Sequence, residues 1–136
     1  MKLGISEILK KASEIKDEKM RIGWLRQNDS NVLRGILKGA LDPSIEWQLP
    51  EGNPPYKEND LVDQQNILYS EYRRLYLFTK NGNPNLKQIR RESLFIELLE
   101  SVDKDDAKLL LHMKDKNLPY PGVTKDIINK AFPGLI

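Results

Sequence analysis

The sequence contains no cysteine and a single histidine, His112, among its 136 residues. The lack of cysteine excludes a disulfide framework, a thiol nucleophile and any zinc or iron–sulfur site built from cysteines, and one histidine excludes a multi-histidine metal centre. No apolar run approaches the roughly 20 residues that a membrane-spanning helix needs. Glu7 interrupts the N-terminus before a signal-peptide core could form. We therefore expect a cytoplasmic protein without a membrane segment, a metal site or another cofactor.

An excess of one charge is also missing. The chain has 22 Lys and Arg residues against 20 Asp and Glu residues, which leaves a net charge of +2. Such a balance provides no overall field that would attract nucleic acid or a membrane. The length and an apolar fraction of 39% are typical of one globular domain. We expect a single domain over residues 1–136.

Apolar residues recur at three- and four-residue steps along most of the chain, and no segment alternates with the period of two that strands show. Residues suited to begin helices stand before these stretches, namely Ser6, Asp17, Asp29 or Ser30, Asp103 and Thr124. The sequence predicts an all-α fold, a compact bundle of about six or seven helices with one long Pro-rich loop. The N-terminal helices lie in residues 1–41, the loop in residues 42–66 and the C-terminal helices in residues 67–136.

Two helices are predicted after the loop, close together in the sequence. The first is expected over about residues 63–79 and is ended by Asn81–Gly82, because glycine tolerates the left-handed conformation common at helix ends. The second is expected to begin at once, with Asn83 as its N-cap and Pro84 in its first position. Ile89 falls on the predicted buried side of this second helix.

The loop of residues 42–66 combines prolines with six acidic residues and one lysine. Trp47, Leu49, Tyr56 and Leu61 supply apolar surface with which it can lie against the helices. Trp47 and Tyr56 stand near prolines, and such conformationally fixed aromatic segments are suited to docking into a partner's groove. Packing of both aromatic residues onto the protein's own core is the alternative.

Basic residues and tyrosines gather between Tyr69 and Arg91. Arginine can bind phosphate with two hydrogen bonds, and tyrosine can stack on bases or anchor a protein interface. We consider three interpretations of this segment: a nucleic-acid surface, a protein-binding surface, or an ordinary solvated face. The candidate binding residues are Tyr69, Arg73, Arg74, Tyr76, Lys80, Lys87, Arg90 and Arg91.

No motif identifies a catalytic centre. His112 lies in an apolar helical stretch, which is typical of a histidine at the margin of a core. Asp103, Asp105 and Asp106 lack the spacing and glycine of a calcium loop, and Asp103 is better suited to capping a helix. There is no glycine-rich phosphate loop. We assign no catalytic or metal-binding residue, and an enzyme or nucleotide-binding protein with a site hidden from the sequence is left as a third alternative.

Four stretches of the chain resemble a family of small proteins of unknown function from T-even-like tailed phages, especially those that infect marine bacteria. The stretches are Leu49–Lys57, Asn81–Leu86, Arg90–Phe95 and Ala131–Leu135. The resemblance implies expression in the cytoplasm of an infected bacterium, where small proteins without enzymatic activity commonly bind host or phage machinery. It implies no catalytic residue.

The leading hypothesis from the sequence is a non-enzymatic helical protein that binds a host or phage macromolecule. The two candidate surfaces are the segment rich in arginine and tyrosine and the Pro-rich acidic loop. Direct binding of nucleic acid through the basic residues is the runner-up.

Overall fold

The computed structural model describes residues 3–136, and every regular element in this range is a helix, without a strand. Its only β-type pairing is an isolated antiparallel bridge between Trp47 and Thr79. The prediction of an all-α fold is confirmed. The described residues form seven α-helices and one 3-10 helix: α1 (Ile5–Glu14), α2 (Glu18–Gln27), α3 (Asn31–Leu41), α4 (Ile67–Glu71), η1 (Tyr72–Phe78), α5 (Gln88–Ser101), α6 (Lys104–Lys114) and α7 (Lys125–Ala131).

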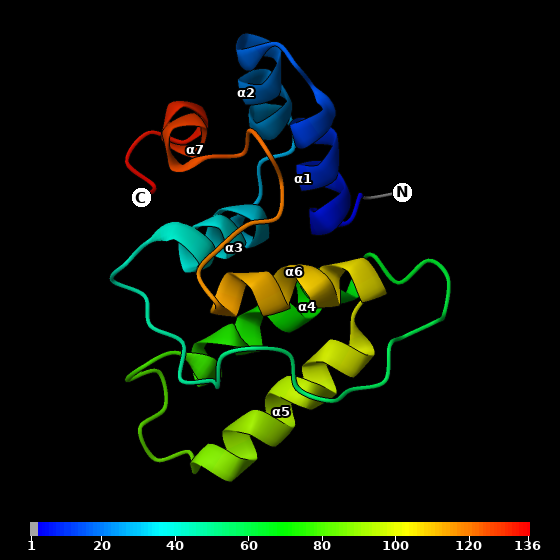
Figure 1. Ribbon diagram of the computed structural model, residues 1–136, viewed down its shortest axis with the longest axis vertical. Coiled ribbons are helices and arrows are strands. Elements are labelled where there is room, and N and C mark those ends of the chain that lie inside the picture. The colour runs from blue at the N-terminus through cyan, green and yellow to red at the C-terminus, as the bar shows by residue number, and fades with distance from the viewer. Residues whose placement is uncertain (1–2) are drawn as a thin grey trace.

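Helix α6 lies at the centre of the arrangement. It packs against α1, α3 and α5, while α2 packs against α1 and α7. Figure 1 shows α1, α2 and α7 grouped at one end of the molecule and α4 and α5 at the other. The side chains of Leu109, Leu110 and Met113 on α6 are fully buried, so this helix joins the two groups through one apolar core. None of the described helices is both long enough and apolar enough to span a bilayer.

Four of the five predicted helix starts are confirmed. Asp17 accepts a hydrogen bond from the Met20 N–H, Ser30 accepts one from the Leu33 N–H, Asp103 caps α6, and Thr124 caps α7. The expectation for Ser6 is wrong, because α1 begins at Ile5 with Gly4 as its N-cap, and Ser6 is buried inside the first turn. Capping residues act on neighbouring N–H groups, which explains why four of these five sites could be found from the sequence.

The prediction of a single helix over residues 63–79 is wrong. The structure has the short α4 followed by the 3-10 helix η1. In a 3-10 helix the side chains of residues i and i+3 lie on the same side. Leu75 and Phe78 therefore both face the core, where they are buried, whereas Arg73 and Tyr76 share an exposed side.

The predicted start of the next helix is also wrong. Residues 80–86 form turns, and α5 begins at Gln88 with Lys87 as its N-cap residue. Asn81, not Gly82, has the positive φ of 67°. A side chain on Gly82 would clash with the Tyr76 carbonyl oxygen, so the glycine permits a close approach of two backbone segments.

Cationic side chains donate hydrogen bonds to carbonyl oxygens at the C-terminal ends of three helices, α1, α3 and α7. The Lys116 ammonium donates hydrogen bonds to the carbonyl oxygens of Gly39, Asp42 and Ile45, at 2.7, 2.7 and 2.9 Å. Arg21 and Arg26 do the same for the final carbonyls of α1 and α7. The last carbonyls of a helix lack partners within it and carry negative partial charge, so a cation there is stabilising.

Replacing Lys116 with methionine is expected to lower the free energy of unfolding by about 2–4 kcal/mol, because three carbonyl oxygens lose a charged donor. Urea denaturation followed by circular dichroism measures this change. Lys38→Met is the matched control, since Lys38 is exposed on α3 and makes no such bonds. Equal stabilities of the two variants would show that Lys116 does not hold the end of α3.

Candidate functional site

Arg91 belongs to the candidate binding residues, but its side chain is directed into the protein. The residue is 8% exposed, and its guanidinium donates hydrogen bonds to the carbonyl oxygens of Leu77, Asn83 and Leu86 at 3.1–3.3 Å. It also donates to the Gln88 side chain. Because these acceptors occupy its donors, Arg91 organises the turn of residues 79–87 and leaves little of its surface open to a partner.

The other five basic candidates are exposed. Arg73, Lys87 and Arg90 form no ion pair with any described residue, whereas Arg74 pairs with Glu71 and Lys80 pairs with Glu46, both at 3.3 Å. Exposed pairs of this kind contribute little to stability and exchange readily with a partner's charges. The structure thus leaves a cluster of accessible positive charge before and at the start of α5.

The two candidate tyrosines differ in their surroundings. Tyr69 is half-buried, and its hydroxyl donates to the Leu3 carbonyl oxygen at 2.6 Å. Tyr76 is 56% exposed, and Ile89, which was predicted to be buried, is 81% exposed. We call the exposed side chains of η1, of the turn that follows it and of the first turn of α5 the hairpin end; they are Arg73, Tyr76, Lys80, Lys87, Ile89 and Arg90.

The aromatic residues of the loop pack onto the protein itself. The Trp47 indole N–H donates to the Gly39 carbonyl oxygen at 2.9 Å. A Cβ on Gly39 would lie 2.7 Å from the indole ring, so glycine makes room for this contact. Tyr56 is half-buried against the core, and burial raises the pKa of its hydroxyl. Of the two interpretations of these residues, the structure favours packing onto the core over presentation to a partner.

Sequence reasoning missed the exposed part of the same loop. Leu61 was expected to pack inward but is 71% exposed, and its neighbour Val62 is 81% exposed. We call residues 57–63 the loop end. Asn59 holds its conformation, since its side-chain amide donates to the Ser101 carbonyl oxygen at 3.0 Å and its oxygen accepts the Leu61 N–H at 3.0 Å. Two aliphatic side chains are thus presented to water on an anchored turn.

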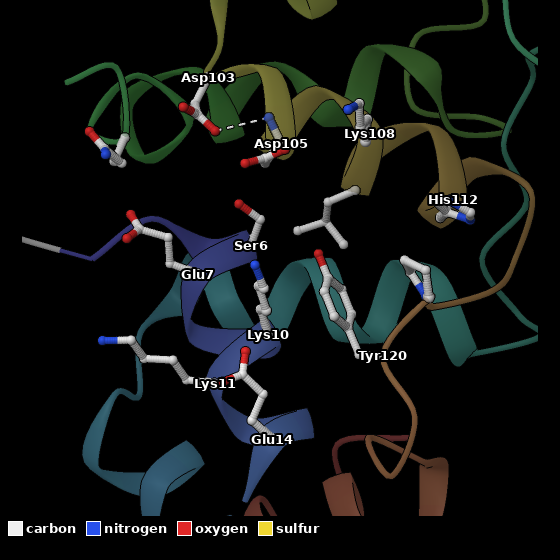
Figure 2. Close-up of a pocket in the computed structure, with 13 residues that line it drawn as sticks. Ser6, Glu7, Lys10, Lys11, Glu14, Asp103, Asp105, Lys108, His112 and Tyr120 are labelled. Atoms are coloured by element: carbon white, nitrogen blue, oxygen red, sulfur yellow. Dashed lines mark hydrogen bonds between the residues drawn. The ribbon is translucent and has the colours of Figure 1, made fainter. Parts of the chain in front are cut away.

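A hollow of about 670 Å³ lies between α1 and α6 and is bordered by Pro119 and Tyr120. Figure 2 shows the Tyr120 hydroxyl and the Lys10 amino group directed into it. Its lining brings carboxylates from Glu7, Glu14, Asp103 and Asp105 together with the ammonium groups of Lys10, Lys11 and Lys108. Because charges of both signs are interspersed, the hollow does not select strongly for an anion or a cation.

His112 lines this hollow, and its ring is hydrogen-bonded to an amide side chain. Its Nδ1 lies 2.7 Å from the Asn117 side-chain oxygen, and no acidic side chain among the described residues is hydrogen-bonded to it. Within residues 3–136, no cluster of three or more His, Asp or Glu residues is placed to hold a metal ion. The hollow therefore offers polar contacts but no arrangement that defines a reaction.

A buried carboxyl group lies where α1 meets α6. Asp106 has no exposed surface, and its Oδ1 accepts the Ser6 N–H at 3.0 Å, so it caps the first turn of α1 from another helix. Burial raises the pKa of Asp106 to about 6, and the nearby carboxylates of Asp103 and Glu7 add to this rise. In the described chain, the Asp106 Oδ2 and the Ser6 hydroxyl are buried without a hydrogen-bond partner.

Comparison with known proteins places the chain in a family. The model of a family of unknown function, DUF6433, matches residues 8–120. The chain belongs to this family. The match to the DUF6433 family covers the hairpin end, the loop end and all of α5 and α6. No curated protein matches the chain.

Proposed function

We propose that this DUF6433 protein is a non-enzymatic binding protein whose hairpin end docks onto an acidic surface of a partner protein. The observation that supports this is the combination of Arg73, Lys87 and Arg90, none ion-paired within the described chain, with the exposed side chains of Tyr76 and Ile89. Arginine and tyrosine are prominent among residues that contribute most to protein interfaces. The cations provide orientation and fast association, and the two apolar side chains provide area to bury.

The hairpin end is rigid before any partner arrives. Arg91 holds the turn through its carbonyl contacts, and the Gln88 side-chain amide donates to the Gln48 carbonyl oxygen at 2.9 Å. The Gln48 N–H in turn donates to the Phe78 carbonyl oxygen at 2.7 Å. A surface held in this way loses little conformational entropy on binding, which favours affinity.

Direct binding of nucleic acid is the second candidate function. Exposed cations beside the exposed ring of Tyr76 support it, since single-stranded nucleic acids bind basic grooves with stacking aromatics. Three features weigh against it: Arg91 is buried, the Tyr69 hydroxyl is directed at the Leu3 carbonyl, and Ile89 adds an aliphatic group that phosphates do not need. We therefore prefer a protein partner.

The phage resemblance suggests where such a partner is found. We propose that the protein acts in the cytoplasm of a phage-infected bacterium, on a host or phage protein. The resemblance supports this setting through the stretches Leu49–Lys57, Asn81–Leu86 and Arg90–Phe95.

Replacing both Arg73 and Arg90 with glutamate is expected to weaken binding of the partner at least about tenfold, because attraction becomes repulsion. The tagged protein is purified from infected cells with and without nuclease, the retained polypeptide is identified by mass spectrometry, and its affinity is measured with purified components. Lys16→Glu with Lys19→Glu is the matched control, since both lysines are exposed and lie outside the hairpin end.

The nuclease arm separates the two candidate functions. Protein binding is supported if the wild type and the control variant still retain the polypeptide after nuclease treatment and the hairpin variant does not. Labelled single-stranded DNA or RNA provides the test of the second candidate function. If it binds with an affinity that falls steeply with salt, and the hairpin variant does not bind it, nucleic-acid binding replaces protein binding as the function. Equal affinities of the hairpin and control variants for the partner would refute the proposed surface.

A further inference from the structure

The charges on α5 are placed against the dipole of the helix. Arg90 and Arg91 lie in its first turn, which contains no acidic residue, and Glu97 and Glu100 lie toward its C-terminal end, where the last turn contains no basic residue. A helix carries positive partial charge at its N-terminus and negative partial charge at its C-terminus, so this order is unfavourable in an isolated chain. Local rules are commonly broken where a surface serves a function.

The turn of the hairpin end, with Lys80, Lys87, Ile89 and Arg90, and the loop end lie at opposite ends of α5. Arg91 joins the turn of residues 79–87 to the start of the helix. At its other end, the Glu100 carboxylate accepts the Lys57 N–H at 2.7 Å, and the Ser101 carbonyl oxygen accepts from Asn59. Helix α5 has 14 residues and is thus about 20 Å long. Figure 1 shows the turn before α5 and the last part of the connection that precedes α4 on opposite sides of the molecule.

The loop end is acidic as well as apolar. Its carboxylates come from Glu58, Asp60 and Asp63, opposed by Lys57. Glu58 lies 3.9 Å from Lys108, while Asp60 and Asp63 form no ion pair with any residue of the described range. The part of the chain that the structure describes has five exposed large apolar side chains. Leu61 and Val62 lie at this end, Tyr76 and Ile89 belong to the hairpin end, and Met20 lies elsewhere. The two ends are therefore opposite in charge and alike in offering apolar area.

We propose that copies of this chain associate head to tail, the loop end of one copy docking onto the hairpin end of the next. This rests on the proposed function, because it identifies an acidic surface that the hairpin end accepts. Leu61 and Val62 pack against the neighbour's Tyr76 and Ile89, and Asp60 and Asp63 approach the neighbour's cations. The negative end of each α5 meets the positive end of the next, so the unfavourable charge order is relieved. A contact between two different surfaces is a heterologous interface, and its repetition from copy to copy builds a ring or an open chain.

Sedimentation velocity of the full chain over a range of concentrations tests this arrangement. The mass of the wild type is expected to rise with concentration, and the rise to weaken with added salt, because screening reduces the attraction of exposed charges. Two variants, one without two cations of the hairpin end and one without the two aliphatic side chains of the loop end, are each expected to weaken association at least about tenfold. The glutamine hairpin variant carries Arg73→Gln with Arg90→Gln, in place of the glutamates used to test partner binding. The loop variant carries Leu61→Ser with Val62→Ser, and all four positions are exposed.

Mixing the two variants gives the decisive result. Each retains one intact end, so an equimolar mixture is expected to form particles of two chains, one of each variant, and nothing larger. Met20→Ser, which removes the remaining exposed apolar side chain, is the control and is expected to associate as the wild type does. Circular dichroism of every variant verifies the fold.

Two outcomes would overturn head-to-tail association. One is a wild type that keeps the mass of a single chain up to about millimolar concentration; the other is self-association that the loop variant does not weaken. Either result leaves the proposed function standing if the glutamate hairpin variant, Arg73→Glu with Arg90→Glu, still loses the partner protein. Both proposals would be refuted if the glutamate variant kept the partner protein and the glutamine variant self-associated as the wild type does.

Discussion

Replacing Arg91 with methionine is expected to lower the free energy of unfolding by about 3 kcal/mol. The variant removes the donor shared by the Leu77, Asn83 and Leu86 carbonyl oxygens. Three part-buried carbonyl oxygens lose a charged donor, and only that of Asn83 keeps a backbone partner within the described chain, the Leu86 N–H, whereas methionine preserves most of the apolar stem. Denaturation by urea, followed by circular dichroism, measures the change.

The adjacent Arg90 is the matched control. It is exposed and donates no hydrogen bond to a described residue, so Arg90→Met is expected to change the stability by less than about 0.5 kcal/mol. The same variant is expected to weaken binding at the hairpin end, whereas Arg91→Met acts through folding. If the two variants were equally stable, the turn of residues 79–87 would not depend on Arg91, and the rigidity assigned to the hairpin end would be lost.

Replacing Asp106 with asparagine is expected to raise the free energy of unfolding at pH 7 by about 2–3 kcal/mol and to change it little at pH 4. Asparagine resembles the protonated acid, keeps an oxygen for the Ser6 N–H, and brings an amide donor close to the Ser6 hydroxyl. It therefore removes the cost of burying a carboxylate. Thermal or urea unfolding of both proteins across this pH range provides the measurement.

The direction of the pH dependence follows from the raised pKa of Asp106, which is about 6 in the folded protein. The unfolded chain loses this proton near pH 4, so between pH 4 and pH 6 the folded state binds more protons than the unfolded state. The contribution of Asp106 to stability consequently falls as pH rises through this window and is constant above it.

Asp105→Asn on the same helix is the control, because Asp105 is exposed. Its effect is expected to stay below about 0.5 kcal/mol at either pH. Subtracting the wild-type profile from that of Asp106→Asn cancels the titration of every other group. A difference that does not grow between pH 4 and pH 7 would show that the buried carboxyl group is already ionised at pH 4 in the folded protein.

Helix content and the starts of α2, α3, α6 and α7 were predictable because their causes are local. The apolar period of α1, α3 and α6 is contained in each segment. Ser30, Asp103 and Thr124 cap N–H groups within three residues of themselves, so their action requires no knowledge of the rest of the chain. Membership of the family is also a property of the sequence, since the match spans residues 8–120.

The roles of individual charged and aromatic residues were not predictable in the same way. Arg90 and Arg91 are identical neighbours in the sequence, yet one is exposed and the other is 8% exposed among carbonyl groups. Trp47 and Leu61 both appeared suited to packing, but only Trp47 meets a glycine that admits its ring. These outcomes depend on which distant segment lies opposite each side chain.

The sequence alone determined that this protein is all-α and where most of its helices begin, because hydrogen bonds and apolar periods within a few residues decide both. Only the tertiary structure decided which cations are structural and which are accessible, that η1 is a 3-10 helix, and that Leu61 and Val62 are exposed. The physical reason is distance along the chain: Lys116 acts on α3, and Asp106 acts on Ser6, 100 residues away.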